Sequence, residues 1–336
     1  MTGGGHRRFL FFAVGIASLA GAVFLSLTFG ATSLDLGAAI SGVNGSDRLV
    51  LLYERLPRTF LAALVGASLS TAGLVFQAIL ANPLADPFII GVAGGAALGG
   101  TLAMLLPFAA FAGQVGVSLS SFVFAIGAIA LTYRLSRDRT GRIRTYEVLL
   151  IGVVFNAFAS AVIMFLKTVV RAEKAQEMLL WLMGTLSSDI RGWDSLSVAA
   201  IISAVAMTVL YSVTPALNAL SLGEEDAASV GVDPGRVTRI VFVAGSLLVA
   251  AAVSVAGLIG FVGLIVPHAV RAVIGSDHRA TLPACALYGA TFLILADLAT
   301  RVLFPVFETE APVGVLTALI GGPMFVYLLK RGGRRT

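Results

Sequence analysis

Residues 55–87 of the chain read Arg55-Leu-Pro-Arg58, then an apolar run to Ile79, then Asn82-Pro83-Leu84-Ala85-Asp86-Pro87. The last two prolines cannot continue a helix, because each lacks an N–H group and restricts the residue before it. A short loop is therefore expected between two apolar segments that are each long enough to cross a bilayer. Such a loop is suited to bind a partner protein. The two arginines at the far end of the first segment are suited to a second binding surface on the opposite side.

The composition places the chain in a membrane. Of its 336 residues, 58% are hydrophobic and 12% are charged, and the mean hydropathy is +0.96. A soluble domain carries about twice that charged fraction. The sequence therefore predicts an all-α polytopic membrane protein whose single domain covers residues 1–336, with about 9–330 embedded in the bilayer.

Ten apolar runs are close to the length of about 20 residues that spans a hydrocarbon core of about 30 Å. The first follows His6-Arg7-Arg8 and exceeds the roughly 7–15 apolar residues of a secretory signal, so we interpret it as a retained helix. The predicted spans are 9–29, 58–80, 88–106, 114–134, 146–168, 196–214, 236–254, 257–274, 283–303 and 313–330.

Loop charges predict the orientation. Most of the 23 Lys and Arg residues fall on the side of the membrane that the N-terminus would share with every second loop. Because positive residues mark cytoplasmic loops, both termini are predicted to lie in the cytoplasm and the protein in the inner membrane. This orientation places Asn82, Pro83, Asp86 and Pro87 inside. It places Arg55, Arg58 and Arg301 outside.

The residues that could supply energy or chemistry are few. Lys167 and Glu147 fall at span ends, and Asp297 and Arg301 are spaced to pair on one helix face. A chain with so few buried ionisable groups has little means of coupling to protons. No Gly-Lys pair exists, which excludes a P-loop, and the single cysteine (Cys285) and three histidines argue against a metal cluster. We therefore predict no catalytic residue, metal or cofactor, and an energy source in another protein.

The longest inside loop follows the sixth span. We predict that Ser221 caps a short helix there, with Glu224, Glu225 and Asp226 in the first turn and Gly231 at its end. Such a helix is either a surface filler or a docking element for a cytoplasmic motor. The candidate docking residues are Leu217, Leu220, Ser221, Leu222, Gly223, Glu224, Glu225, Ala228 and Gly231.

The chain from about Leu51 to Lys330 resembles the FecCD-type permease subunits of type II ABC importers, which take up iron–siderophores, haem and cobalamin. The resemblance lies in a series of motifs that occur in the family's order. They are Arg55-Leu-Pro-Arg58, Asn82-Pro-Leu-Ala-Asp-Pro87, Gly91-Val-Ala-Gly-Gly-Ala96, Trp181-Leu-Met-Gly184, Leu222-Gly-x4-Ala228-x-x-Gly231, Gly257-x-Ile-Gly-Phe-Val-Gly-Leu-x-x-Pro-His268, Asp277-His-Arg279, Ala296-Asp297 and Pro312-Val-Gly314.

The resemblance implies two permeases around a central passage and two cytoplasmic ATPase subunits that receive residues 217–231. It also implies that Arg55, Arg58 and Arg301 face carboxylates of a substrate-binding protein, since Arg forms bidentate pairs with carboxylates. The alternative for Arg301 is its pair with Asp297, and for the other two it is anchoring to lipid headgroups. The expected cargo is a metal chelate, an iron–siderophore first, with haem or cobalamin as alternatives. The rival function is a secondary transporter or channel acting alone.

Overall fold

The computed structural model of the protein describes residues 3–30, 34, 36–41, 45–105, 107–137, 144–186, 193–303 and 311–332. Every regular element in these ranges is a helix. The elements are α1 (Gly3–Thr28), α2 (Leu36–Ser41), α3 (Gly45–Val50), the π-helix η1 (Leu51–Arg55), α4 (Leu56–Ile79), the 3₁₀-helix η2 (Pro87–Ile90), α5 (Val92–Leu105), α6 (Pro107–Leu135), α7 (Thr145–Val169), α8 (Ala172–Leu182), α9 (Trp193–Ser212), α10 (Thr214–Leu220), α11 (Glu224–Ser229), α12 (Pro234–Ala256), α13 (Val262–Ile274), α14 (His278–Val302) and α16 (Val313–Gly332).

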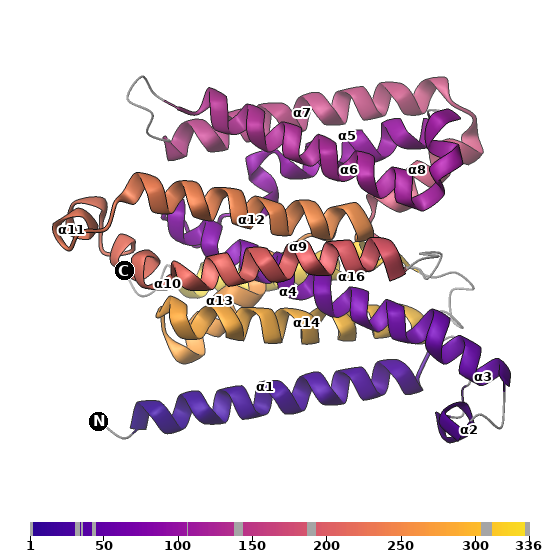
Figure 1. The fold of residues 1–336 in the computed structure, drawn as a ribbon, viewed down its shortest axis with the longest axis horizontal. Helices are drawn as coiled ribbons and strands as arrows, with labels where there is room; N and C mark the ends of the chain where they lie inside the picture. The colour runs from indigo at the N-terminus through magenta and orange to yellow at the C-terminus, as the bar shows by residue number, and fades with distance from the viewer. Residues whose placement is uncertain are drawn as a thin grey trace.

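The long helices run side by side, with α5–α8 on one flank of the bundle and α1 on the other (Figure 1). Helix α4 is central, because it contacts α9, α12, α13 and α14. Small residues make this close packing feasible, since helices in lipid associate by close contact of their backbones. A Cβ atom added to Gly73 of α4 would lie 1.9 Å from the carbonyl oxygen of Gly263 in α13.

The ten predicted spans correspond to ten apolar helices. Seven described helices are long and apolar enough to cross a membrane, and three shorter apolar helices accompany them. The long ones are Gly5–Thr28, Gly45–Ile79, Val115–Leu135, Tyr146–Val169, Ser195–Ser212, Pro234–Ala256 and His278–Val302. The short ones are Val92–Leu105, Val262–Ile274 and Val313–Val326.

Several boundaries differ from the prediction by a few residues, and the second and third spans show why. The second span begins at Gly45, because the π-helix Leu51–Arg55 leads into α4 and places Pro57 in the first turn of α4, where a missing N–H costs little. The third span is shorter, because a 3₁₀-helix starts at Pro87 and a left-handed residue, Gly91 (φ 92°), separates it from α5.

The bundle has two distinct ends. Helix α1 begins and α16 ends at the end that carries α10 and α11, whereas α2 and α3 lie at the opposite end (Figure 1). We call these the α10 end and the α3 end. Because α4 starts beside α3, the loop 80–87 that follows it lies at the α10 end, where α10 contacts α4.

Candidate functional site

The 217–231 loop projects from the α10 end as two short helices, α10 and α11, separated by a turn. Its surface carries two large apolar side chains, with Leu222 75% and Val230 70% exposed. Leu217, in contrast, is fully buried beneath the loop and anchors it to the bundle. Exposed apolar side chains at the polar end of a membrane protein are a common property of surfaces that bind a partner.

Backbone geometry explains the shape of this loop. Gly223 lies between α10 and α11 at φ 133°, a conformation that L side chains rarely adopt. Gly231 follows α11 at φ 82°, which confirms the predicted end of the short helix. The acidic residues Glu224, Glu225 and Asp226 occupy the first turn of α11, as predicted.

The predicted cap is wrong, because Gly223 precedes α11 and no side chain caps that helix. Ser221 instead follows α10, and its hydroxyl donates to the carbonyl oxygen of Asn218 at 2.7 Å. The turn at Gly223 directs the chain away from Ser221 before α11 begins. Ser221 therefore closes the first helix of the loop.

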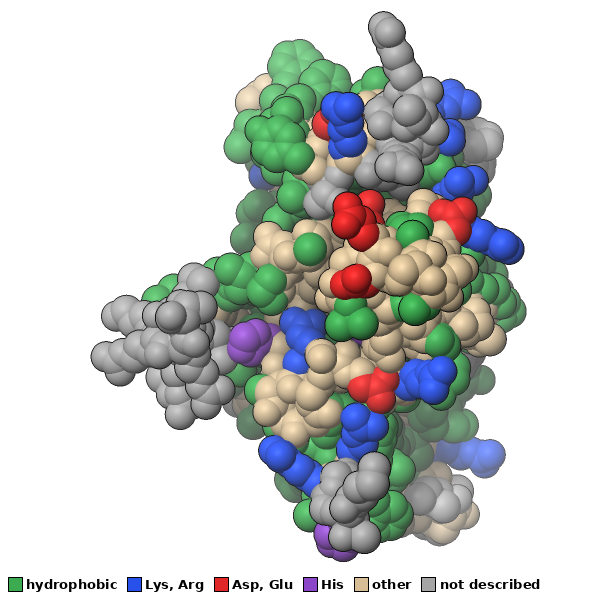
Figure 2. All heavy atoms as spheres, turned by 90° about the vertical axis from the view of Figure 1, so that its left-hand side faces the viewer, with side chains coloured by type: hydrophobic (Ala, Val, Ile, Leu, Met, Phe, Trp, Pro, Cys, Tyr) green, Lys and Arg blue, Asp and Glu red, His purple; other side chains and the backbone are tan. Residues whose placement is uncertain are grey.

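The α10 end has a patterned surface. Acidic side chains gather near its middle, with hydrophobic ones between them and basic ones around them (Figure 2). The acidic residues of α11 are all exposed, and so are the candidate docking residues Leu222, Gly223, Ala228 and Gly231. This surface offers a partner both apolar contact and negative charge.

The 82–87 loop lies at the same end and is shaped by its own side chains. The Asn82 carboxamide oxygen accepts from the Leu84 N–H at 2.9 Å, and the Asp86 carboxylate accepts from the Phe88 N–H at 2.8 Å, which caps η2. Burial raises the pKa of Asp86, and the bond from Phe88 opposes that rise. Asn82 and Pro83 are exposed, whereas Pro87 is buried. The predicted tight turn is thus confirmed, and its tip is open to solvent.

Gln77 fastens the 82–87 loop to the bundle. This side chain is 4% exposed, and its amide nitrogen donates to the carbonyl oxygens of Gly263 at 3.1 Å and Ala85 at 3.4 Å. The Arg271 guanidinium donates to its amide oxygen. Gln77 therefore connects α4, α13 and the loop.

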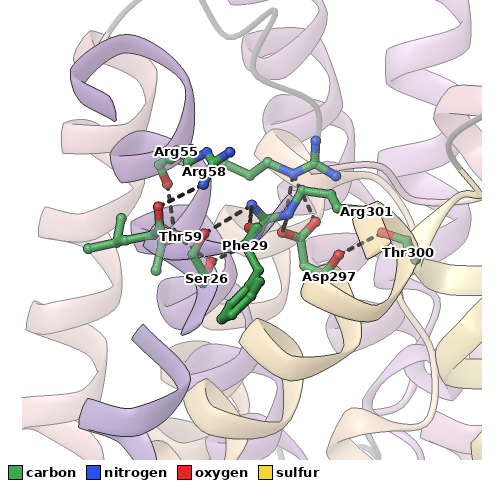
Figure 3. Close-up of polar contacts among 9 residues, drawn as sticks. Ser26, Phe29, Arg55, Arg58, Thr59, Asp297, Thr300 and Arg301 are labelled. Atoms are coloured by element: carbon green, nitrogen blue, oxygen red, sulfur yellow. Dashed lines mark hydrogen bonds and ion pairs between the residues drawn. The ribbon is translucent and has the colours of Figure 1, made fainter. Parts of the chain in front are cut away.

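A second polar group lies at the α3 end and is buried among apolar helices. The Asp297 carboxylate of α14 is shared by Arg58 of α4 and Arg301 of α14, at 2.9 Å and 3.1 Å (Figure 3). We call Arg55, Arg58, Asp297 and Arg301 the arginine cluster. The pair between Asp297 and Arg301, which was the alternative to docking for Arg301, is present. The contact with Arg58 cannot be predicted from the spacing of nearby residues. A buried acid in an apolar span nevertheless normally has a cationic partner.

The arginine cluster also holds the C-terminus of α1. Arg55 donates to the carbonyl oxygens of Leu27 and Thr28 at 2.8 Å and 2.7 Å. Arg301 donates to the Ser26 carbonyl oxygen at 3.1 Å and to the Ser26 hydroxyl at 2.6 Å (Figure 3). Cations suit a helix C-terminus, where carbonyl groups lack intrahelical partners. The cluster thus joins α1, α4 and α14.

These contacts change the expectation for the three arginines. Arg55, Arg58 and Arg301 are only 3%, 6% and 4% exposed, and their guanidinium groups are engaged by groups of α1 and α14. A role in docking stays a prediction, whereas a role in joining helices follows from the contacts.

A cavity of about 310 Å³ lies between α5 and α7, and Leu182 and Leu258 complete its wall. Asn156, Ser160 and Lys167 are its polar lining residues. Asn156 also accepts from the Gly94 N–H and donates to the Phe88 carbonyl oxygen, which holds α7 against α5. Lys167 lies at the end of α7, as predicted.

Comparisons with known proteins identify the family of this multi-pass helical bundle. The model of the FecCD transport family matches residues 18–331. The cobalamin import permease of Halobacterium salinarum is 42% identical over 289 residues, covering 86% of this chain and 75% of the relative. The molybdate import permease of Haemophilus influenzae is 37% identical over 288 residues, covering 84% and 82%.

The fold has a solved counterpart. An inward-facing structure described as a metal-chelate type ABC transporter matches with a TM-score of 0.82 and 33% identity, covering 96% of this chain and 99% of that chain. The chain belongs to the FecCD transport family. It is accordingly a multi-pass membrane permease of the metal-chelate, haem and vitamin B12 importer type.

Proposed function

We propose that this chain is the permease subunit of an ABC importer that moves a metal chelate inward across the cytoplasmic membrane. The observation that carries the proposal is the 217–231 loop, which exposes Leu222 and Val230 at a charged end of the molecule. An ATPase subunit that covers these side chains would both bury them and supply the energy. The similarity to a metal-chelate type transporter supports the class of cargo, and an iron–siderophore is our first candidate.

Surface charge supports the orientation. The basic residues Arg8, Arg236, Arg239 and Arg279 are exposed at or near the α10 end. The excess of positive charge favours the cytoplasm for this end, so the α3 end would receive a substrate-binding protein. We infer a dimer of this chain, or of this chain and a related permease, with the passage between the two copies.

The rival function, a secondary transporter, needs a titratable group that can change its charge during transport. Asp297 is the buried acid available among the described residues of the long spans, and it is held by Arg58 and Arg301. Its two guanidinium partners tie it to α4 and to the next turn of α14, which is the arrangement of a structural ion pair that joins helices. The arginine cluster therefore favours an external motor.

We predict that transport requires ATP and does not follow the proton gradient. Proteoliposomes that contain the permease with its ATPase would be given the binding protein loaded with a ferric hydroxamate or with cobalamin. Uptake is expected only with ATP inside the compartment that faces the α10 end, and a protonophore should leave its rate unchanged. Uptake without ATP, or at a rate set by the pH gradient, would overturn the proposal.

The exposed apolar residue of the loop provides a second prediction. Leu222→Asp should weaken binding of the ATPase subunit at least about fivefold, because apolar anchors at interfaces contribute more than about 1 kcal/mol each. The affinity can be measured with the detergent-solubilised permease and the purified ATPase. The control is Leu49→Asp, since Leu49 is 59% exposed on α3 at the opposite end. Equal affinities for both variants would show that the loop is a surface segment that does not bind the ATPase.

A further inference from the structure

Asn218 connects the 217–231 loop to the start of α14. Its carboxamide oxygen accepts from the His278 N–H at 2.8 Å and lies 2.7 Å from the His278 Nδ1 atom. Its amide nitrogen donates to the Asp277 carboxylate at 2.9 Å. One side chain on α10 therefore makes three contacts with two consecutive residues outside its own loop.

Asp277, which accepts from Asn218, also has two other partners. Asp277 caps α14 by accepting from the Arg279 N–H at 3.1 Å, and it pairs with Arg8 of α1 at 3.2 Å. The hydrogen bond from Asn218 is the largest cause that lowers the pKa of Asp277. The carboxylate therefore remains charged at neutral pH, and Asn218, α14 and α1 meet at one point of the α10 end.

Helix α14 extends from this point to the arginine cluster. Its 25 residues correspond to a rod of about 37 Å at 1.5 Å per residue. Asp297 and Arg301 near its far end hold α4 and α1. Along its length it packs tightly on α4, since a Cβ atom on Gly66 would lie 2.2 Å from the Gly289 carbonyl oxygen. Helix α14 is thus joined to α1 at both ends and to α4 in the middle and at the far end, and we call these three helices the α14 unit.

We propose that Asn218 is a positioning residue that passes movement of the 217–231 loop to the α14 unit, and through it to the arginine cluster at the α3 end. This inference rests on the proposed function, in which an ATPase moves the loop. Tightly packed elements move as bodies, because close-packed cores switch between discrete arrangements and do not deform continuously. A displacement of α10 that pulls on Asn218 would therefore displace α14 along its whole length.

The test compares Asn218→Ala with unaltered permease in the complete complex with its ATPase. Cysteines placed at Val302 of α14 and Val169 of α7 would carry spin labels, since both positions are more than half exposed and the native Cys285 is fully buried. Trapping the complex with ATP and vanadate is expected to change the distance between the labels in the unaltered permease. In Asn218→Ala that change should be lost while the ATPase stays bound. Stimulation of ATP hydrolysis by the binding protein should fall about tenfold, within the range of coupling between sites.

Thr208→Ala is the matched control, because the Thr208 hydroxyl donates to the Ala204 carbonyl oxygen within α9 at 2.8 Å. It should keep the full distance change. A normal distance change in Asn218→Ala, or none in the unaltered complex, would overturn the inference. Loss of ATPase binding in Asn218→Ala would also overturn it, because Asn218 would then belong to the docking surface. Failure of the unaltered permease to bind any ATPase would contradict the proposed function itself.

Discussion

Asp297→Asn is expected to destabilise the folded permease by about 3–5 kcal/mol, the range for breaking a buried ion pair from one side. The change keeps the shape of the side chain but leaves Arg58 and Arg301 beside a neutral amide, and both side chains are about 95% buried. Stabilities of single domains are about 5–15 kcal/mol, so the loss is a large fraction of the total. The measurement is the denaturation midpoint of the purified permease in detergent, together with the yield of folded protein.

Glu177→Gln serves as the control for this prediction. Glu177 pairs with Lys174 on α8 at 2.7 Å, but the two side chains are 57% and 37% exposed. Ion pairs at such positions contribute about 0–1 kcal/mol, so the midpoint should hardly change. Equal effects of the two substitutions would show that Asp297 does not neutralise the buried arginines.

The second large effect is expected for Gly73→Ala, at about 3 kcal/mol, the upper end of the usual cost of overpacking. The added Cβ atom would meet three backbone atoms of Gly263 at 1.9–2.6 Å, and backbone cannot rotate away as a flexible side chain can. Helices α4 and α13 would have to separate, which would also disturb the bond between Gln77 and the Gly263 carbonyl oxygen. Thermal denaturation in detergent would record the loss.

Gly21→Ala is the counterpart, since a Cβ atom at Gly21 of α1 has no neighbour within 4 Å. Alanine is a better helix former than glycine, so this variant should be neutral or slightly more stable. If Gly73→Ala melted like Gly21→Ala, the close approach of α4 and α13 would not be required.

The spans could be predicted from the sequence, because the length and apolarity of a bilayer-crossing helix are properties of one run of consecutive residues. It was insufficient where polar residues extend a helix beyond its apolar run, as at Gly45–Val50 before α4. The 82–87 turn was predictable from its prolines, whose restrictions are local. The cap of α11 was not, because the turn at Gly223 removes Ser221 from it.

The site shows the same limit. Pairing of Asp297 with Arg301 follows from helical spacing, whereas Arg58 reaches Asp297 across 239 positions of sequence. No periodic pattern or motif in the sequence predicts which helices of a bundle pack against each other. For the same reason the contacts of the arginines inside the bundle could not be predicted, since their partners on α1 and α14 come from distant parts of the chain.

The attachment of α1 to α14 has a consequence for biogenesis. Helix α1 leaves the ribosome before the other described helices, but its partners Asp277, Tyr288 and Arg301 all belong to a helix that begins at His278 or to the residue before it. At about 5–20 residues per second, the roughly 250 intervening residues need about 12–50 s of synthesis. During that interval α1 lies in the lipid without the ninth span, so its attachment to α14 forms late in synthesis, when α16 is the one described helix still to follow.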